Sequence, residues 1–282
     1  MSSKIYFQKD ATFNVRKTMV NLSTRLHHRL APQHAKKIAM KVLLTPERSH
    51  RQVDAPDGLV RQPIMTSEGT MMTYRLGEGP TWVLGHGWSG SATQFLPLMA
   101  HIAAAGYTAL AFDNPAHGES EGLYGHLPGF IRALDDVLEA QTQIAGVVAH
   151  SMGGAMVLES AHACLQGKPV LLVAPVLNYT DNLVSAVQHS GYSMKLFNAV
   201  VEDIAQAYQC PLNSIDPVAK LHQWQGKVVI VHDRQDRFAA FTESETASAL
   251  NHVTLIATEG LGHGRILQSE QLRQGFDLLL AS

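Results

Sequence analysis

The sequence predicts an α/β protein with a mostly parallel central sheet that helices cover on both faces. Short apolar runs typical of buried strands alternate along the chain with segments of helical periodicity, which is the pattern of a parallel sheet. Clusters of Gly, His, Ser and Asp follow several of these runs, at the strand ends where open α/β sheets hold their functional sites. The length of 282 residues leaves room for an extension beyond one domain of ~200–250 residues.

The composition is that of a globular protein. Hydrophobic residues make up 45% and charged residues 16%, which gives no sign of disorder. No apolar run approaches the ~20 residues that a membrane span needs. Lys4, Lys9 and Asp10 interrupt any secretory segment, so the expected compartment is the cytoplasm. Two cysteines as far apart as Cys164 and Cys210 predict neither a disulfide in that setting nor a metal site.

The N-terminal segment, residues 1–57, reads as a basic helical arm ahead of a main domain at 58–282. Helical spacing of apolar residues runs over 13–45, where Pro32 is expected to begin a second helix and Pro46 to end it. A turn at Pro56-Asp57-Gly58 then separates the arm from the main domain.

Charge is unevenly distributed between these two parts. Residues 1–51 carry a net charge of +9 and the remainder −11. We therefore expect the arm to pack against the acidic body and partly neutralise it. Peripheral contact with an anionic membrane is the alternative. Nucleic acid is not an expected partner, because the arm lacks interleaved aromatic residues on which bases could stack.

The main domain divides into strands and helices by its apolar pattern. A hairpin is expected first, turning across residues 67–69, and single strands alternate with helices after it. The expected strands are 60–65, 70–76, 82–84, 107–112, 144–149, 170–176, 228–232 and 254–257, and the helices 94–105, 129–143, 155–161 and 265–280. Residues of about 177–222 show helical spacing and no strand, which predicts a helical lid inserted between two strands.

Ser151 occupies the most informative position in the chain. An apolar run stops at this serine and small residues follow it, in the form A-x-S-x-G from Ala149 to Gly153. A serine on a tight strand-to-helix turn is held in a strained conformation with its hydroxyl exposed, and small neighbours are needed because strand and helix nearly touch. The pattern predicts a nucleophile elbow.

A nucleophilic serine needs a base to take its proton and an acid to orient the base. His263 lies between glycines in a loop before the last helix, where it can reach the serine, and we take it as the base. Asp236 lies in the loop after the strand at 228–232, whereas Asp233 directly ends that strand and is suited to capping the turn. Asp236 is therefore our choice of acid.

Acyl transfer also needs donors for the developing oxyanion. The backbone N–H groups of Trp88, after the Gly85-His86-Gly87 loop, and of Met152, after the serine, are the expected donors. His86 and His117 are expected to bond backbone rather than act as bases. His150, directly before the serine, is expected to contact the substrate.

Taken together, these motifs resemble the α/β-hydrolase superfamily, in particular its esterase- and lipase-like members with a His-Gly-Trp oxyanion loop. The resemblance rests on His86-Gly87-Trp88, Asp113-x-Pro-Ala-His117-Gly118-x-Ser120, His150-Ser151-Met152-Gly153-Gly154, Asp236 and Gly262-His263. It covers roughly residues 60–282 and implies the roles of nucleophile, acid and base for Ser151, Asp236 and His263.

The fold alone does not fix the reaction. A serine at 151 argues against the dehalogenases and epoxide hydrolases of the superfamily, which use aspartate there. The apolar lid favours hydrolysis of carboxylic esters with apolar groups, with no cofactor and no metal. Thioester, amide or C–C bond hydrolysis remains open, as does a ligand-binding protein without turnover.

Overall fold

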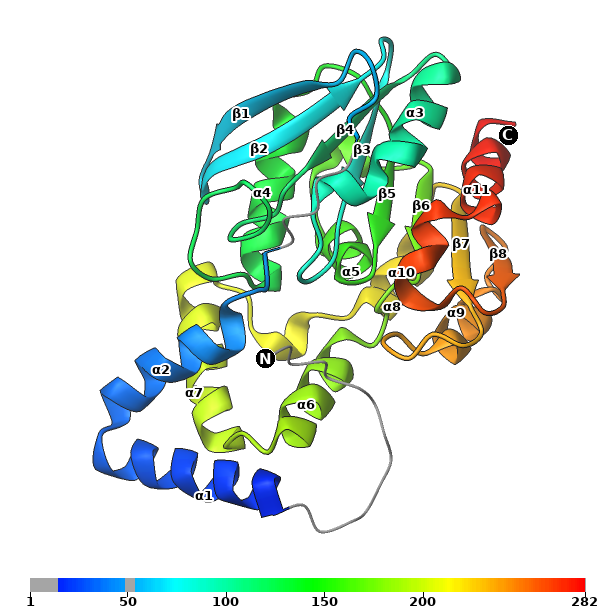
Figure 1. Cartoon of the computed structure of the whole chain (residues 1–282). Coiled ribbons are helices and arrows are strands. Elements are labelled where there is room, and N and C mark those ends of the chain that lie inside the picture. The colour runs from blue at the N-terminus through cyan, green and yellow to red at the C-terminus, as the bar shows by residue number, and fades with distance from the viewer. Residues whose placement is uncertain (1–14, 49–53, 282) are drawn as a thin grey trace.

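A computed structural model describes residues 15–48 and 54–281. The expected start of the first helix at residue 13 lies outside these residues, as do Lys4, Lys9, Asp10 and Arg51. Figure 1 shows a sheet sandwiched by helices at one end and a separate group of helices at the other. The strands are β1 (Val60–Thr66), β2 (Gly69–Leu76), β3 (Thr81–Gly85), β4 (Thr108–Phe112), β5 (Ile144–His150), β6 (Val170–Val173), β7 (Val228–Asp233) and β8 (Val253–Thr258).

From β3 onward, helices alternate with strands as the sequence predicts. The helices are α1 (Val15–Leu30), α2 (Pro32–Leu44), α3 (Leu96–Ala104), α4 (Leu127–Glu139), α5 (Met152–Glu159), α6 (Tyr179–Ser190), α7 (Met194–Tyr208), α8 (Pro217–Gln223), α9 (Phe241–Ala247), α10 (Gly262–Arg265) and α11 (Glu270–Leu280). None of the described helices is long and apolar enough to cross a membrane.

The eight strands form one sheet in the order β1-β2-β4-β3-β5-β6-β7-β8. The hairpin β1–β2 and the pair β2–β4 are antiparallel, and every other pair is parallel. The carboxyl ends of β3 to β8 therefore meet at one edge. This edge gathers the loops in which the sequence concentrates its Gly, His, Ser and Asp residues.

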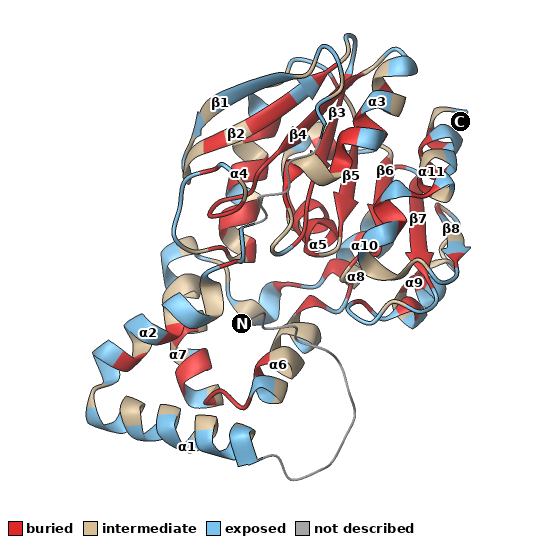
Figure 2. Cartoon of the chain, viewed as in Figure 1, coloured by how far each residue is buried: buried red, intermediate tan, exposed pale blue. Residues whose placement is uncertain are grey.

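Alternating side chains of the strands build two cores, one on each face of the sheet. Along β3, Val83 packs with α4 and α5, whereas Trp82 and Leu84 pack with α3 and α11. Figure 2 shows the buried sheet between these layers. The two-sided burial explains why the central strands read as continuous apolar runs.

The segment between β6 and β7 contains α6, α7 and α8 and no strand, as the sequence predicts. Helix α2 of the arm shares a third apolar cluster with α6 and α7, built on Ala35, Ala39, Leu196 and Phe197 among others. The arm thus packs on the inserted helices. Its far end is tied to the main domain by Arg48, whose guanidinium donates to the carbonyl oxygens of Gly118, Ser120 and Gly122.

Several elements differ from their predicted bounds. Strand β6 ends at Val173, because Ala174 turns into a positive φ of 44°. Helix α5 begins at Met152 and ends at Glu159, three residues earlier at its start than expected. The last predicted helix is interrupted at Ser269, whose hydroxyl accepts the Leu272 N–H and so caps a separate helix, α11.

Candidate active site

Ser151 lies on the sharp turn that joins strand β5 to helix α5. Its backbone has φ 58° and ψ −123°, a conformation that costs a non-glycine residue ~1–3 kcal/mol. Strand and helix approach closely here, since a Cβ on Gly153 would lie 2.5 Å from the carbonyl oxygen of Gly85. The turn holds the serine hydroxyl at the carboxyl edge of the sheet, in the geometry that the A-x-S-x-G pattern predicts.

The structure brings together Ser151, His263 and Asp236, which lie far apart in the sequence. The Oγ of Ser151 is 2.9 Å from Nε2 of His263, and Nδ1 of His263 is 2.7 Å from Oδ2 of Asp236. The three side chains come from the turn after β5, from α10 after β8, and from the loop after β7. They form a continuous chain of hydrogen bonds from hydroxyl to carboxylate.

The Asp236 carboxylate is fully buried. Burial by itself would raise its pKa, but His232, His263 and backbone N–H donors stabilise the charged form more strongly. Its Oδ1 accepts from the N–H groups of Phe238 and Ala239 at 2.7 and 3.1 Å. The pKa of Asp236 consequently lies well below its usual range, so this side chain faces His263 as an anion.

Asp233, the alternative acid, forms hydrogen bonds with the loops after β7 and β8 rather than with His263. Its carboxylate accepts from the Leu261 N–H at 2.9 Å, from the Thr258 hydroxyl at 2.8 Å and from the Gln235 N–H at 3.0 Å. These bonds tie the loop after β7 to the loop after β8. Asp233 therefore holds together the two segments that carry Asp236 and His263, without touching the histidine ring through any hydrogen bond of the described residues.

Two buried histidines fix the loop after β3. Nε2 of His86 accepts the Asn114 N–H at 2.9 Å, and Nε2 of His117 accepts the Ser89 N–H at 3.0 Å. The Nδ1 of each ring donates to a backbone carbonyl. Burial lowers the pKa of His86 to about 4 and that of His117 to about 3, so both rings are neutral near pH 7. Both bond backbone, as expected from the sequence.

The loop after β3 passes directly against the serine. A Cβ on Gly87 would lie 2.7 Å from Cβ of Ser151 and 3.1 Å from its Oγ. Trp88 follows this glycine, and Met152 is the first residue of α5, where backbone N–H groups have no partner within the helix. The two residues expected to provide oxyanion donors thus border the serine from two sides.

His150 packs against His263. Its ring is buried, with its centroid 4.8 Å from that of His263, and its Nε2 donates to the backbone carbonyl of His263 at 3.0 Å. Burial, followed by the proximity of His263, lowers the pKa of His150 to about 3. These contacts position His263, and the expected contact of His150 with substrate stays a prediction.

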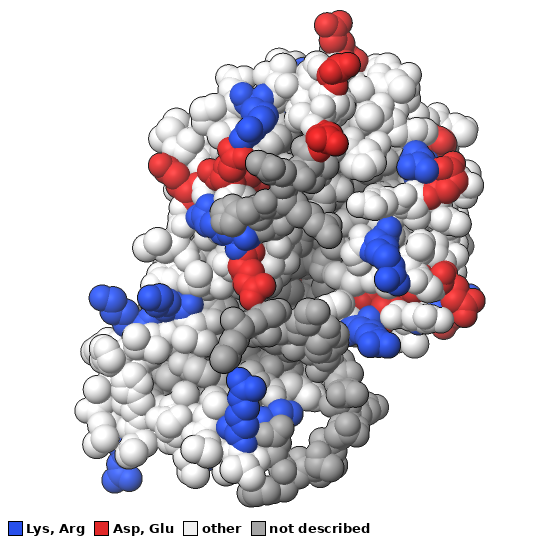
Figure 3. All heavy atoms as spheres, viewed as in Figure 1, with Lys and Arg blue, Asp and Glu red and all other residues white. Residues whose placement is uncertain are grey.

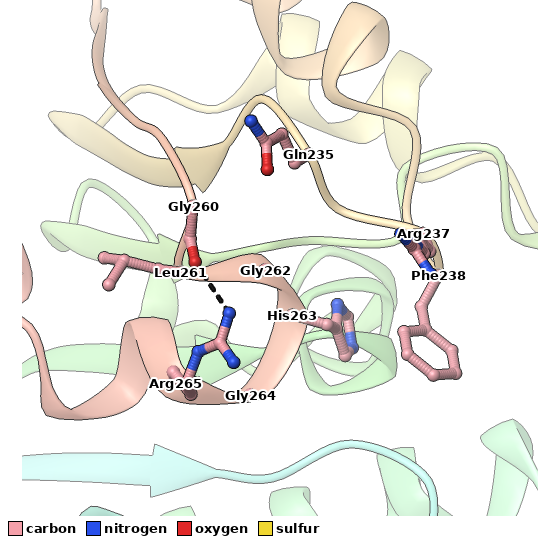
Figure 4. Close-up of a pocket in the computed structure, with 9 residues that line it drawn as sticks. All are labelled: Gln235, Arg237, Phe238, Gly260, Leu261, Gly262, His263, Gly264 and Arg265. Atoms are coloured by element: carbon pink, nitrogen blue, oxygen red, sulfur yellow. Dashed lines mark hydrogen bonds between the residues drawn. The ribbon is translucent and has the colours of Figure 1, made fainter.

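A pocket of about 450 Å³ opens beside His263. In Figure 4 the imidazole of His263 and the ring of Phe238 lie side by side, and their centroids are 5.1 Å apart. The guanidinium of Arg265 is held by the carbonyl oxygen of Gly260 at 2.6 Å. The lining residues are Gln235, Arg237, Phe238, Gly260, Leu261, Gly262, His263, Gly264 and Arg265. This lining combines apolar surface with two cationic side chains.

His232 is a site residue to which the sequence analysis gave no role. Its ring is completely buried, and Nδ1 accepts the Ser244 hydroxyl at 2.7 Å. Nε2 lies 3.3 Å from Oδ2 of Asp236, close enough for attraction although the pair is not aligned for a full hydrogen bond. The available signal was its place four residues before Asp236 at the end of an apolar strand.

Over residues 15–48 and 54–281, no group of three or more His, Cys, Asp or Glu side chains is arranged to hold a metal ion. Cys164 and Cys210 are free thiols.

The fold matches solved structures of several hydrolases. Esterase Pf2001 of Pyrococcus furiosus is 21% identical, with a TM-score of 0.63 over 84% of this chain and 98% of that one. A thioesterase domain from the curacin biosynthetic pathway is 14% identical, with a TM-score of 0.57 over 79% and 100%. A membrane phospholipase A, described as a bacterial virulence factor, is also 14% identical, with a TM-score of 0.57 over 92% and 94%. At such identities the likeness shows the fold.

No curated protein matches the chain in sequence. The family model described as serine aminopeptidase, S33, matches residues 80–220, which is half of the chain and runs from β3 through the turn at Ser151 to the inserted helices. With this match and the eight-stranded sheet described above, the chain belongs to the serine aminopeptidase S33 family of α/β-hydrolases.

Proposed function

We propose that the protein hydrolyses carboxylic esters through an acyl-enzyme on Ser151. His263 takes the hydroxyl proton as Oγ attacks the ester carbonyl, and it then gives this proton to the departing alkoxide. A water molecule deprotonated by His263 attacks the acyl-serine, which releases the carboxylic acid and restores the hydroxyl. The 2.9 Å separation between Ser151 Oγ and His263 Nε2 is the main support.

Asp236 acts in this scheme as the orienting acid. Its anionic carboxylate fixes the ring of His263 with Nδ1 protonated and stabilises the imidazolium that forms during attack. The Trp88 and Met152 N–H groups stabilise the oxyanion, each at ~3–4 kcal/mol. The scheme uses only groups of the protein and no cofactor, and the cytoplasm remains its expected setting.

The pocket supports an ester rather than a peptide with a free amino end. None of the nine described residues that line it is acidic, whereas Arg237 and Arg265 bring positive charge that would repel an ammonium group. Phe238 and Leu261 offer apolar contact to an acyl or alcohol group. We therefore favour esters with apolar groups within a family whose description names aminopeptidases.

The test is a series of p-nitrophenyl esters of increasing acyl length, run with wild type and Ser151→Ala. Wild type should hydrolyse them with a preference for apolar chains, and Ser151→Ala should lose all measurable turnover while it melts at a similar temperature. A fluorophosphonate probe should label wild type alone. A folded wild-type protein that neither turns over esters nor accepts the probe would instead be a ligand-binding member of the family.

A further inference from the structure

Helix α1 carries an apolar stripe on its solvent side. Its members recur at spacings of four, three, four and four, which keeps them on one helix face. All are between 57% and 74% exposed, and helix α1 buries no residue fully. The stripe consists of Val15, Met19, Leu22, Leu26 and Leu30.

The opposite face of α1, which is largely polar, packs on the protein. Asn21 donates to the carbonyl oxygen of Gly191 at 3.3 Å, in the turn between α6 and α7, and the ring of His27 lies 2.8 Å from that of His34 on α2. Val20 is the one residue of this face that joins the apolar cluster of α2, α6 and α7. An ordinary surface helix turns its apolar stripe to the core, whereas α1 turns its polar face to the protein and its apolar stripe to solvent.

Positive charge surrounds the stripe. Arg25 and Arg29 flank it on α1, and neither α1 nor α2 contains an acidic residue. Helix α2 adds Lys37 and Lys41, besides Lys36, which pairs with Asp203 of α7. Helix α2 also exposes Ile38 and Val42. Figure 3 shows Lys and Arg side chains at the end of the molecule where Figure 1 places α1 and α2.

We propose that α1 docks on a lipid surface with anionic headgroups, lying in the plane of the interface with its apolar stripe among the acyl chains. An exposed apolar face bordered by cations is the composition of helices that bind such surfaces. A second copy of this chain fits less well, because contact through α1 would bring two basic helices together. Docking by α1 would also bring the turn at Gly191, and with it the inserted helices, to the membrane.

Co-sedimentation of the full chain with vesicles tests this proposal. The protein should sediment with vesicles of phosphatidylglycerol and phosphatidylcholine, much less with phosphatidylcholine alone, and less as salt is raised. Leu22→Glu combined with Leu26→Glu should abolish sedimentation. Arg25→Gln combined with Arg29→Gln should weaken it by roughly 30-fold, from the loss of two cations near the surface.

Met65→Glu is the matched control, since Met65 is an exposed apolar residue on the edge strand β1, away from α1. This variant should sediment with the vesicles as wild type does. Thermal unfolding reports whether each variant folds. Sedimentation measures binding directly, so its result does not depend on whether the protein hydrolyses esters. Failure of wild type to sediment, or equal sedimentation of the Leu22→Glu, Leu26→Glu variant, would overturn the proposal. So would a wild-type dimer that this variant splits without any vesicle binding, because the stripe would then join two copies.

Discussion

Two aspartates three residues apart, Asp233 and Asp236, illustrate how much a side chain's neighbours determine its role. Both are buried carboxylates in or directly after β7. Backbone and hydroxyl donors surround Asp233, whereas Asp236 also meets the imidazole of His263. Sequence reasoning separated them by position, one ending a strand and one within the loop. The hydrogen bonds explain why the two positions differ in role: Asp233 links two loops, and Asp236 orients His263.

Replacing each of these aspartates should have a different effect. We expect Asp236→Asn to lower turnover by ~10⁴, because an amide no longer selects the productive tautomer of His263. Asp233→Asn should instead destabilise the fold by ~1–3 kcal/mol through lost loop hydrogen bonds and leave much of the turnover. Steady-state kinetics and denaturant unfolding of both variants provide the comparison. A larger loss of turnover in Asp233→Asn would reverse the assignment.

His232 should support Asp236 without touching the substrate. His232→Phe keeps a ring of similar bulk but removes the nitrogen 3.3 Å from the carboxylate. We expect kcat/KM to fall roughly 10-fold, the rate equivalent of ~1.4 kcal/mol, because the contact is an attraction to a charged group without the alignment of a full hydrogen bond. His222→Gln, on the exposed end of α8, is the control and should behave as wild type. Unchanged kinetics in His232→Phe would show that the buried ring only fills space.

At the scale of elements, the sequence predicted all eight strands. The apolar pattern is clearest in central strands such as β3, β4, β6 and β7, because these are buried on both faces. It missed α9, Phe241–Ala247, since five polar residues in seven positions leave no clear periodicity. It also began the last helix at Arg265, because Ile266 and Leu267 continue the apolar spacing across the break at Ser269, and it placed His263 of α10 in a loop. The pattern found the amphipathic stripe of α1, but only tertiary packing decides which face of a helix meets the protein.

The loop after β3 depends on glycine at position 87. In Gly87→Ala the added methyl would collide with Ser151, so the loop must move and carry the Trp88 N–H with it. A displacement of about 1 Å in such a position costs ~10²-fold in rate, which is the loss we expect in kcat/KM. The melting temperature should change little. Gly264→Ala is the matched variant, because a Cβ there meets nothing within 4 Å, and it should retain most of its activity.

The whole molecule should lose stability in mild acid. Burial lowers the pKa of His86 and His126 to about 4 and that of His117 and His150 to about 3. Unfolding lets each ring take a proton at its ordinary pKa, so the unfolded state binds more protons between about pH 6.5 and 4. The free energy of unfolding should be highest above this window and fall by ~1 kcal/mol per pH unit for each histidine as pH drops.

Chemical denaturation between pH 8 and 4 measures this slope. His150→Gln, which removes one titrating ring, should flatten the curve. A stability that stays constant down to pH 4 would contradict the neutral, buried state of these rings.

The apolar cluster shared by α2, α6 and α7 means that the first helices of the chain cannot be trimmed away like a tag. Ala35 and Ala39 have no exposed surface because the inserted helices cover them, and they in turn shield Leu196 and Phe197 from water. If a protease cut the chain near residue 50 and released the first helices, the apolar surface of α6 and α7 that they cover would be exposed to water. The remaining protein would then tend to aggregate through this surface, even with its sheet and Ser151 intact.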